Sequence, residues 1–125
     1  MIVGIPKEVK SGETRVAMTP DLCRRWVSLG VTVMLEPSAG LTAGFTDQEY
    51  RAAGGVVGGS AAEIWRRADL IVKVKEPQPS EYDLMQDGQA LFTYLHLAAV
   101  PELAVVLLKK QILAIAYETV ETAGG

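Results

Sequence analysis

The sequence predicts an α/β domain built on a doubly wound, mostly parallel sheet with helices on both faces, as in Rossmann-like or flavodoxin-like folds. Strand-like and helix-like segments alternate along the 125 residues, and the strand-like segments are almost continuously apolar. Parallel strands that are buried on both faces have this composition, and right-handed crossovers connect them. A chain of this length also favours one domain, residues 1–125.

The expected strands begin at the N-terminus and recur after each helix. "IVGI" is the first of them, and the run "DLIVKVKEP" ends at a proline, which cannot donate to a sheet ladder. The segment "GVV" at residues 55–57 is too short to assign. The expected strands are residues 2–5, 31–37, 69–77, 89–97 and 112–120.

The expected helices are marked by start and stop signals. Thr19 and Pro20 are a cap and a first-turn residue for the first helix, and Leu22, Trp26 and Leu29 share one face, which predicts its buried side. The next two helices begin with capping-box pairs, Thr46 with Glu49 and Ser60 with Glu63. The expected helices are residues 19–30, 46–54, 60–68, 80–85 and 101–111.

Composition excludes several classes of protein. Apolar residues make up 49%, yet no apolar run reaches the roughly 20 residues of a membrane span. The net charge of −3 and the absence of basic runs argue against a nucleic-acid partner. No secretory signal is evident, and the single cysteine, Cys23, allows no internal disulfide. No metal-ligand spacing and no G-x-G-x-x-G dinucleotide motif is present. We therefore expect a cytoplasmic globular protein.

Three ionisable side chains follow three different strands of the expected sheet. Arg15 lies in the connection after the first strand, Lys75 lies at the end of "IVKVK", and His96, the only histidine, lies at the end of "LFTYLH". Ligands bind outside the carboxyl ends of the strands in open α/β sheets. An arginine fork holds a carboxylate, a lysine polarises a carbonyl, and a histidine moves protons near neutral pH. The set suits an anionic keto acid.

Each of these residues also has an ordinary structural interpretation. A histidine beside an apolar run is often a hydrogen-bonded core residue, and a lysine or arginine at a strand end or in a loop is often a solvated charge. Tyr94 lies two residues before His96, so it either lines the same site or packs. Glu118, near the end of the last strand, is a further candidate for this edge.

Four segments follow one another along nearly the whole chain: "GIPKEVKSGETRVAMTP", "IVKVKEPQPSEYDLM", "LFTYLHLAAVPEL" and "AYETVE". In these segments, and in their order, the sequence resembles the N-terminal part of alanine dehydrogenase. The α subunit of nicotinamide nucleotide transhydrogenase is a related family. Lys75 and His96 favour the alanine dehydrogenase branch.

The resemblance implies roles for these residues. Arg15 matches the arginine that binds the substrate carboxylate, Lys75 the lysine that binds substrate and polarises its keto group, and His96 the catalytic acid and base; Tyr94 is a candidate substrate-binding residue. The reaction would interconvert L-alanine with pyruvate and ammonia using NAD. Cofactor-binding residues are expected in a separate domain absent from this chain, so the chain alone should not transfer hydride. Full-length members are expected to be homo-oligomers, with a hexamer implied.

Two alternatives stay open at this stage. The chain is also compatible with a non-catalytic module that keeps the fold as an oligomerising or structural unit. A transhydrogenase-like domain is the third interpretation.

Overall fold

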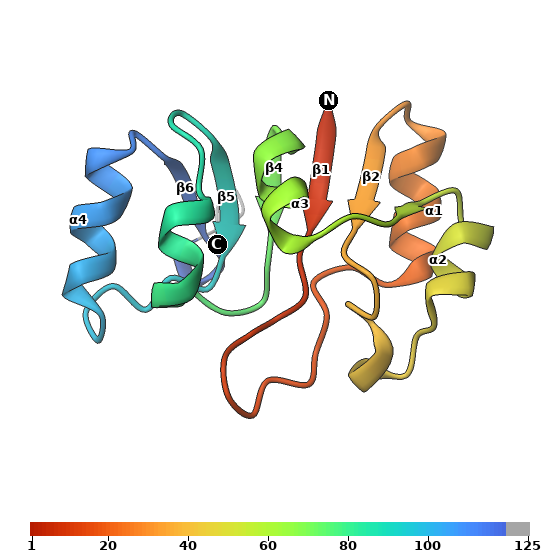
Figure 1. Cartoon of the computed structure of the whole chain (residues 1–125), viewed down its shortest axis with the longest axis horizontal. Helices are drawn as coiled ribbons and strands as arrows, with labels where there is room; N and C mark the ends of the chain where they lie inside the picture. Colours follow the sequence, from red (N-terminus) through yellow and green to blue (C-terminus); the bar gives the residue numbers. More distant parts are fainter. Residues whose placement is uncertain (120–125) are drawn as a thin grey trace, which may run out of the picture.

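The computed structural model describes residues 1–119 and contains a six-stranded sheet in which every pair of neighbours is parallel. The strands are β1 (Ile2–Ile5), β2 (Thr32–Leu35), β3 (Val56–Val57), β4 (Leu70–Val72), β5 (Ala90–Thr93) and β6 (Leu113–Ala116). Their spatial order is β3-β2-β1-β4-β5-β6 (Figure 1). The chain therefore builds outward from β1 to β3, returns to pair β4 with β1, and builds outward again. The predicted doubly wound parallel sheet is confirmed.

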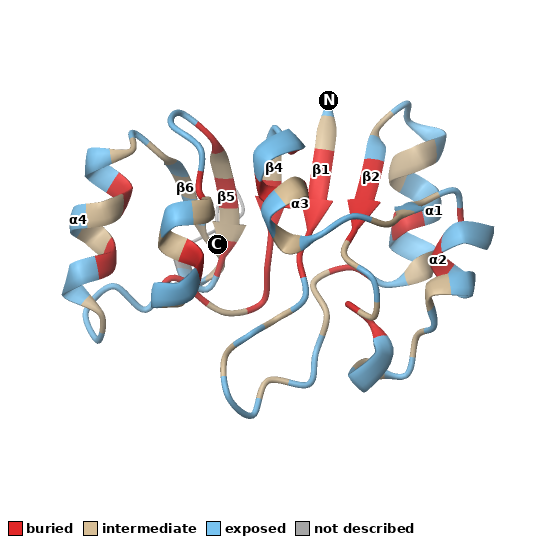
Figure 2. Cartoon of the chain, in the orientation of Figure 1, coloured by how far each residue is buried: buried red, intermediate tan, exposed pale blue. Residues whose placement is uncertain are grey.

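Helices lie on both faces of this sheet. One hydrophobic core contains residues of α1 (Pro20–Ser28) and α2 (Asp47–Ala52), together with Val3, Ile5 and Val33 of the sheet. The other contains residues of α3 (Ala61–Arg67) and α4 (Pro101–Lys109), together with Ile71 and Leu91. Short 3₁₀ turns occur at Leu41–Ala43, Pro79–Leu84 and Tyr117–Thr119. Figure 2 shows buried residues concentrated along the central strands and on the helix sides that face them.

Helix starts follow the sequence signals closely. The Thr19 hydroxyl accepts a hydrogen bond from the amide of Leu22, and Thr46 forms a complete capping box with Glu49. The Ser60 hydroxyl likewise accepts a hydrogen bond from the amide of Glu63, which is one half of the capping box predicted there. The segment predicted as a helix at residues 80–85 is instead the 3₁₀ turn that begins at Pro79.

The predicted buried face of α1 is wrong at two of its three positions. Leu22 and Leu29 are exposed, Leu29 to 80%, whereas Cys23 is fully buried and Trp26 and Val27 are partly buried. The nine-residue helix buries a narrow stripe centred on Cys23, which packs beside Gly55. Leu29 is the C-cap, where the chain already turns toward β2.

The strands are shorter than the apolar runs that predicted them. β4 ends at Val72 and β5 at Thr93, although residues 69–77 and 89–97 were expected to be strands. Beyond these strand ends carboxylates accept backbone amides, while the carbonyl of Val74 still accepts the amide of Tyr94 at 3.2 Å. The carboxylate of Glu8 accepts the amides of Val74 and Lys75, and that of Glu118 accepts the amide of Leu95. The predicted strand 112–120 is β6, which ends at Ala116; residue 120 lies outside the described residues.

Close approach of α3 to β1 requires a glycine. A Cβ atom at Gly4 would lie 2.8 Å from Cβ of Ala68 and 2.9 Å from a methyl of Ile64.

None of the helices in residues 1–119 is both long and apolar enough to cross a membrane.

Candidate functional site

The connections that carry the predicted site residues leave three adjacent strands. Arg15 follows β1, Lys75 follows β4 and His96 follows β5, and these strands are neighbours in the order β1-β4-β5. The winding direction reverses between β1 and β4, and ligands in open α/β sheets bind outside the carboxyl ends of the strands at such a reversal. The topology thus brings the three connections to one edge of the sheet.

Arg15 and Lys75 share one hollow of about 350 Å³. Residues 10–15 and Lys75 line it. The first half of this lining is a tight turn, closed by a hydrogen bond from the amide of Glu13 to the carbonyl of Lys10 and made possible by Gly12 at φ +83°. The hollow is polar, and three cationic residues line it: Lys10, Arg15 and Lys75.

Glu13 holds Arg15 through a two-pronged ion pair. Nε of Arg15 donates to Oε2 at 3.0 Å and Nη2 donates to Oε1 at 2.8 Å. The hydrogen bond from the Arg15 side chain lowers the pKa of Glu13 to about 2, because it favours the charged carboxylate. The hydrogen bond to Glu13, in turn, raises the pKa of Arg15. Glu13 was not identified as a site residue from the sequence.

Lys75 is held by its backbone, and its side chain is left available. Its amide donates to Glu8 at 3.1 Å, and its carbonyl accepts from the Thr93 hydroxyl at 2.8 Å. Within residues 1–119 its ammonium makes no hydrogen bond or ion pair. Its charge contributes to the low pKa of Glu13, which places it within electrostatic reach of that carboxylate.

A buried charge network joins the connections after β1 and β4, which also line this hollow. Lys73 is 1% exposed, and its ammonium lies 3.2 Å from Oε1 of Glu8 and 3.3 Å from Oε2 of Glu81. Burial raises the pKa of Glu81, and the charge of Lys73 opposes that rise. A second pair joins Lys10 to Glu76 at 2.6 Å. Burial opposes ionisation of Glu76, but the hydrogen bond from Lys10 and the other contacts outweigh it and lower its pKa.

The sequence carried one signal for this network that was missed. Lys73 interrupts an apolar run at a position flanked by buried residues, and a buried lysine needs a carboxylate partner. Its partner, Glu8, lies 65 residues away in the chain.

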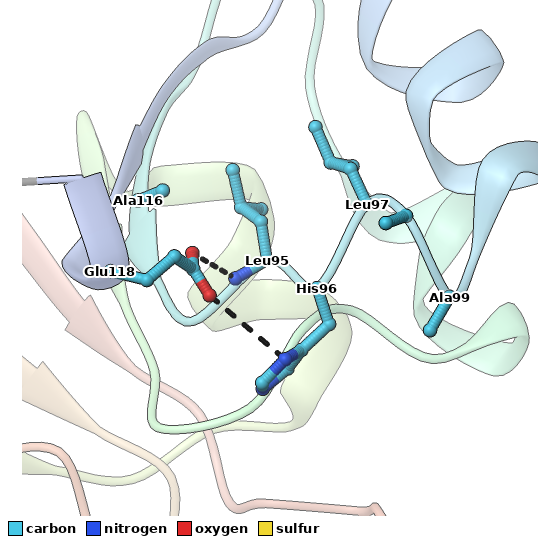
Figure 3. A pocket seen from close by; sticks show the side chains of 7 residues that line it. Leu95, His96, Leu97, Ala99, Ala116 and Glu118 are labelled. Carbon is cyan, nitrogen blue, oxygen red and sulfur yellow. Dashed lines mark hydrogen bonds and ion pairs between the residues drawn. The ribbon is translucent and has the colours of Figure 1, made fainter.

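His96 lines a second hollow of about 380 Å³. The other lining residues are Leu95, Leu97, Ala98, Ala99, Ala116 and Glu118, so this hollow is largely apolar (Figure 3). His96 adopts φ +51°, a left-handed conformation that few residues with a side chain adopt, and its carbonyl accepts the amide of Ala99 at 3.0 Å. Nδ1 of His96 lies 3.9 Å from Oε2 of Glu118, an ion-pair distance that is too long for a hydrogen bond.

Tyr94 belongs to the surroundings of both His96 and Arg15. Its ring is stacked on the imidazole of His96 with centroids 6.1 Å apart, and it meets Tyr117 edge-on at 4.8 Å. Its phenol also contributes, after Glu13, to the raised pKa of Arg15. The structure therefore brings Arg15 and Lys75 into one hollow. His96 lines a different hollow together with Glu118, and Tyr94 stacks on its imidazole.

The chain matches a known family over nearly its whole length. A family model described as "Alanine dehydrogenase/PNT, N-terminal domain" matches residues 4–125. The alanine dehydrogenase of Methanococcus maripaludis is 50% identical over 123 residues, which are 98% of this chain and 33% of that protein. The alanine dehydrogenase of Bacillus subtilis is 48% identical over 120 residues, 96% of this chain and 32% of that protein.

Two solved structures superpose closely on this chain. An L-alanine dehydrogenase structure superposes with a TM-score of 0.94 at 53% identity, covering 98% of this chain and 34% of that one. A transhydrogenase structure from Sinorhizobium meliloti superposes with a TM-score of 0.91 at 31% identity, covering 99% and 37%. The chain spans about a third of the length of the curated relatives it matches.

Proposed function

Because the chain belongs to the alanine dehydrogenase/PNT N-terminal domain family, we propose that it is the substrate-binding and catalytic domain of an alanine dehydrogenase. In the whole protein, the reaction is the reversible oxidative deamination of L-alanine to pyruvate and ammonia. This chain alone binds the substrate and does not transfer hydride. The alanine dehydrogenases that match at 48% and 50% identity support this assignment over the transhydrogenase, which matches at 31%.

The observation that carries the proposal is the shared hollow of Arg15 and Lys75 at the winding reversal of the sheet. Pyruvate offers a carboxylate and an adjacent keto oxygen. A guanidinium binds the first through two parallel hydrogen bonds, and an ammonium binds the second as a point charge. The two cations are of the types that these two groups of pyruvate need.

In the proposed mechanism, Arg15 and Lys75 fix the keto acid and His96 handles protons. Lys75 donates to the keto oxygen and stabilises the negative charge that develops there when ammonia adds to the carbon. That oxygen needs two protons to leave as water: His96 relays the first from the added nitrogen and donates the second as an imidazolium, and it takes both back in the direction of deamination. Glu118 lies on the Nδ1 side of the ring, 3.9 Å away, so Nε2 is the proposed exchanging atom. Tyr94, whose ring stacks on the imidazole of His96, is the further proposed substrate-binding residue.

NAD is the proposed cofactor of the whole protein, but the described residues do not suit a dinucleotide. The N-terminus of α1, the first helix after β1, is capped by the Thr19 hydroxyl, and Asp21 in its first turn would repel a pyrophosphate. The connection before it has none of the glycine spacing of a dinucleotide loop. We therefore assign cofactor binding to parts of the whole protein other than the residues of this chain. A cytoplasmic location and a homo-oligomeric, hexameric assembly complete the proposal.

The test is a titration of the 125-residue chain with pyruvate, followed by the imidazole and amide NMR signals of His96. We expect saturable shifts that Arg15→Ala weakens by about 10- to 100-fold, because two charge-assisted hydrogen bonds are lost. Arg24→Ala, which removes an arginine that pairs with Asp21 on the surface of α1, is the matched control and should leave binding unchanged.

Signals that stay unmoved at saturating pyruvate and alanine would contradict the proposal and favour a non-catalytic module of the same fold. Binding that is equally weakened by both arginine variants would show that net charge, rather than the Arg15 fork, attracts the ligand.

A further inference from the structure

We propose that Glu13 is a positioning residue for the substrate carboxylate. It holds the side edge of the Arg15 guanidinium, Nε with Nη2, and leaves the end edge, Nη1 with Nη2, free to bind the ligand. This inference rests on the proposed function, since it concerns how the same hollow receives a keto acid. Glu13 itself does not touch the substrate.

The ion pair between Glu13 and Arg15 uses a defined part of the guanidinium. An arginine side chain has five N–H donors, and a carboxylate can dock on its side edge, Nε with one Nη, or on its end, Nη1 with Nη2. Glu13 takes the side edge, with bonds of 3.0 Å from Nε and 2.8 Å from Nη2. Nη1 makes no hydrogen bond within residues 1–119. The end edge therefore keeps two parallel donors for a second carboxylate.

Glu13 is a fixed support, unlike the side chain that it holds. The Glu13 side chain is 4% exposed and that of Arg15 is 61% exposed. Oε2 of Glu13 also accepts the backbone amide of Arg15 at 2.7 Å, so both the backbone and the side chain of Arg15 are tied to one carboxylate. The segment is anchored further by the hydroxyl of Thr42, which donates to the carbonyl of Thr14 at 3.1 Å. A long exposed arginine is thereby held in one orientation before the ligand arrives.

The charges around the hollow fit the proposal that Glu13 holds Arg15 while Arg15 and Lys75 bind the ligand. Lys10 is paired with Glu76 and Arg15 with Glu13, whereas Lys75 has no side-chain partner within residues 1–119. One positive charge thus remains for a ligand that carries one negative charge. Glu13 reduces the long-range attraction of Arg15 for an anion, but at an exposed guanidinium that attraction is screened by water and salt. Orientation of the donors is the larger effect, because an ordered side chain loses less entropy on binding.

The test compares pyruvate binding by the wild-type chain, Glu13→Gln and Glu13→Asp, with Asp21→Asn as the matched control. Asp21 also pairs with an arginine, Arg24, but on the surface of α1. We expect Glu13→Gln to weaken binding about tenfold, because a glutamine has one acceptor oxygen and cannot hold both Nε and Nη2. Glu13→Asp keeps the carboxylate and should recover most of the affinity, and Asp21→Asn should change nothing.

A spectroscopic measurement separates this role from a general effect on folding. In the wild type, the Nε–H signal of Arg15 should keep its hydrogen-bonded shift when pyruvate is added, while its Nη signals move. This measurement needs no variant, so it remains decisive if Glu13→Gln fails to fold.

Glu13→Gln binding pyruvate as tightly as the wild type, or more tightly, would overturn the inference, because Glu13 would then be neutral or a competitor for Arg15. Displacement of the Nε–H signal by pyruvate would overturn it too. In both cases wild-type binding would leave the proposed function standing. A wild-type chain that binds no pyruvate would overturn both.

Discussion

Glu8 accepts three hydrogen bonds from the segment that follows β4. Its carboxylate receives the ammonium of Lys73 and the amides of Val74 and Lys75. The β1 exit and the β4 exit are therefore joined by one buried side chain, and the backbone of Lys75 is fixed where it enters the hollow. A single residue here serves both stability and the geometry of the site.

Glu8→Gln should lower the free energy of unfolding by about 2 to 3 kcal/mol, because it leaves the buried ammonium of Lys73 with Glu81 as its one charged partner. Urea unfolding followed by circular dichroism measures the change. Arg24→Gln, at the exposed pair with Asp21, should cost less than about 0.5 kcal/mol. Equal effects of the two substitutions would show that the Glu8–Lys73 pair adds nothing beyond a surface pair.

At the scale of elements, the contact of α3 with β1 depends on the missing side chain of Gly4. Cβ of Ala68 and the methyl groups of Ile64 and Ile71 occupy the space that a Cβ at Gly4 would need, all within 3.0 Å of it. All of these atoms belong to the hydrophobic core on the α3 side, so none moves without disturbing its neighbours.

Gly4→Ala should therefore destabilise the domain by about 1 to 3 kcal/mol through overpacking, even though alanine is the better strand residue in isolation. Gly58→Ala is the control, because a Cβ at Gly58 meets nothing within 4 Å. Thermal unfolding of both variants measures the difference. A Gly4→Ala protein as stable as the wild type would show that α3 can shift away from β1 without cost.

At the scale of the whole molecule, β6 forms one edge of the described sheet and carries exposed apolar side chains. Leu113 is 64% exposed and Ile115 is 40% exposed, and Leu108 on neighbouring α4 is 79% exposed. An apolar sheet edge is a surface on which another copy of the chain can pair.

We expect the 125-residue chain to associate as its concentration rises, and Leu113→Lys to reduce that association. Light scattering across a concentration series measures both. Val9→Lys, at another exposed apolar residue outside the β6 edge, is the control. A chain that stays monomeric at all concentrations would contradict this prediction without affecting the substrate site.

The sequence by itself determined the fold class, the helix starts and the family. These depend on local signals: apolar runs, caps such as Thr19 and Thr46, and motifs read in order along the chain. It also placed Arg15, Lys75 and His96 after strands. Their roles in substrate binding and proton transfer stay predictions.

Only the tertiary structure decided the strand order, the exits of β4 and β5, and the partners of the site residues. Glu8 and Glu118 accept backbone amides 66 and 23 residues away, just beyond the ends of β4 and β5, and nothing in the local sequence links either carboxylate to those amides. The support of Arg15 by Glu13 is close in sequence, yet the bond depends on the side-chain conformations that the turn at Gly12 permits. Long-range pairing and side-chain geometry arise from packing, and packing is a property of the folded chain.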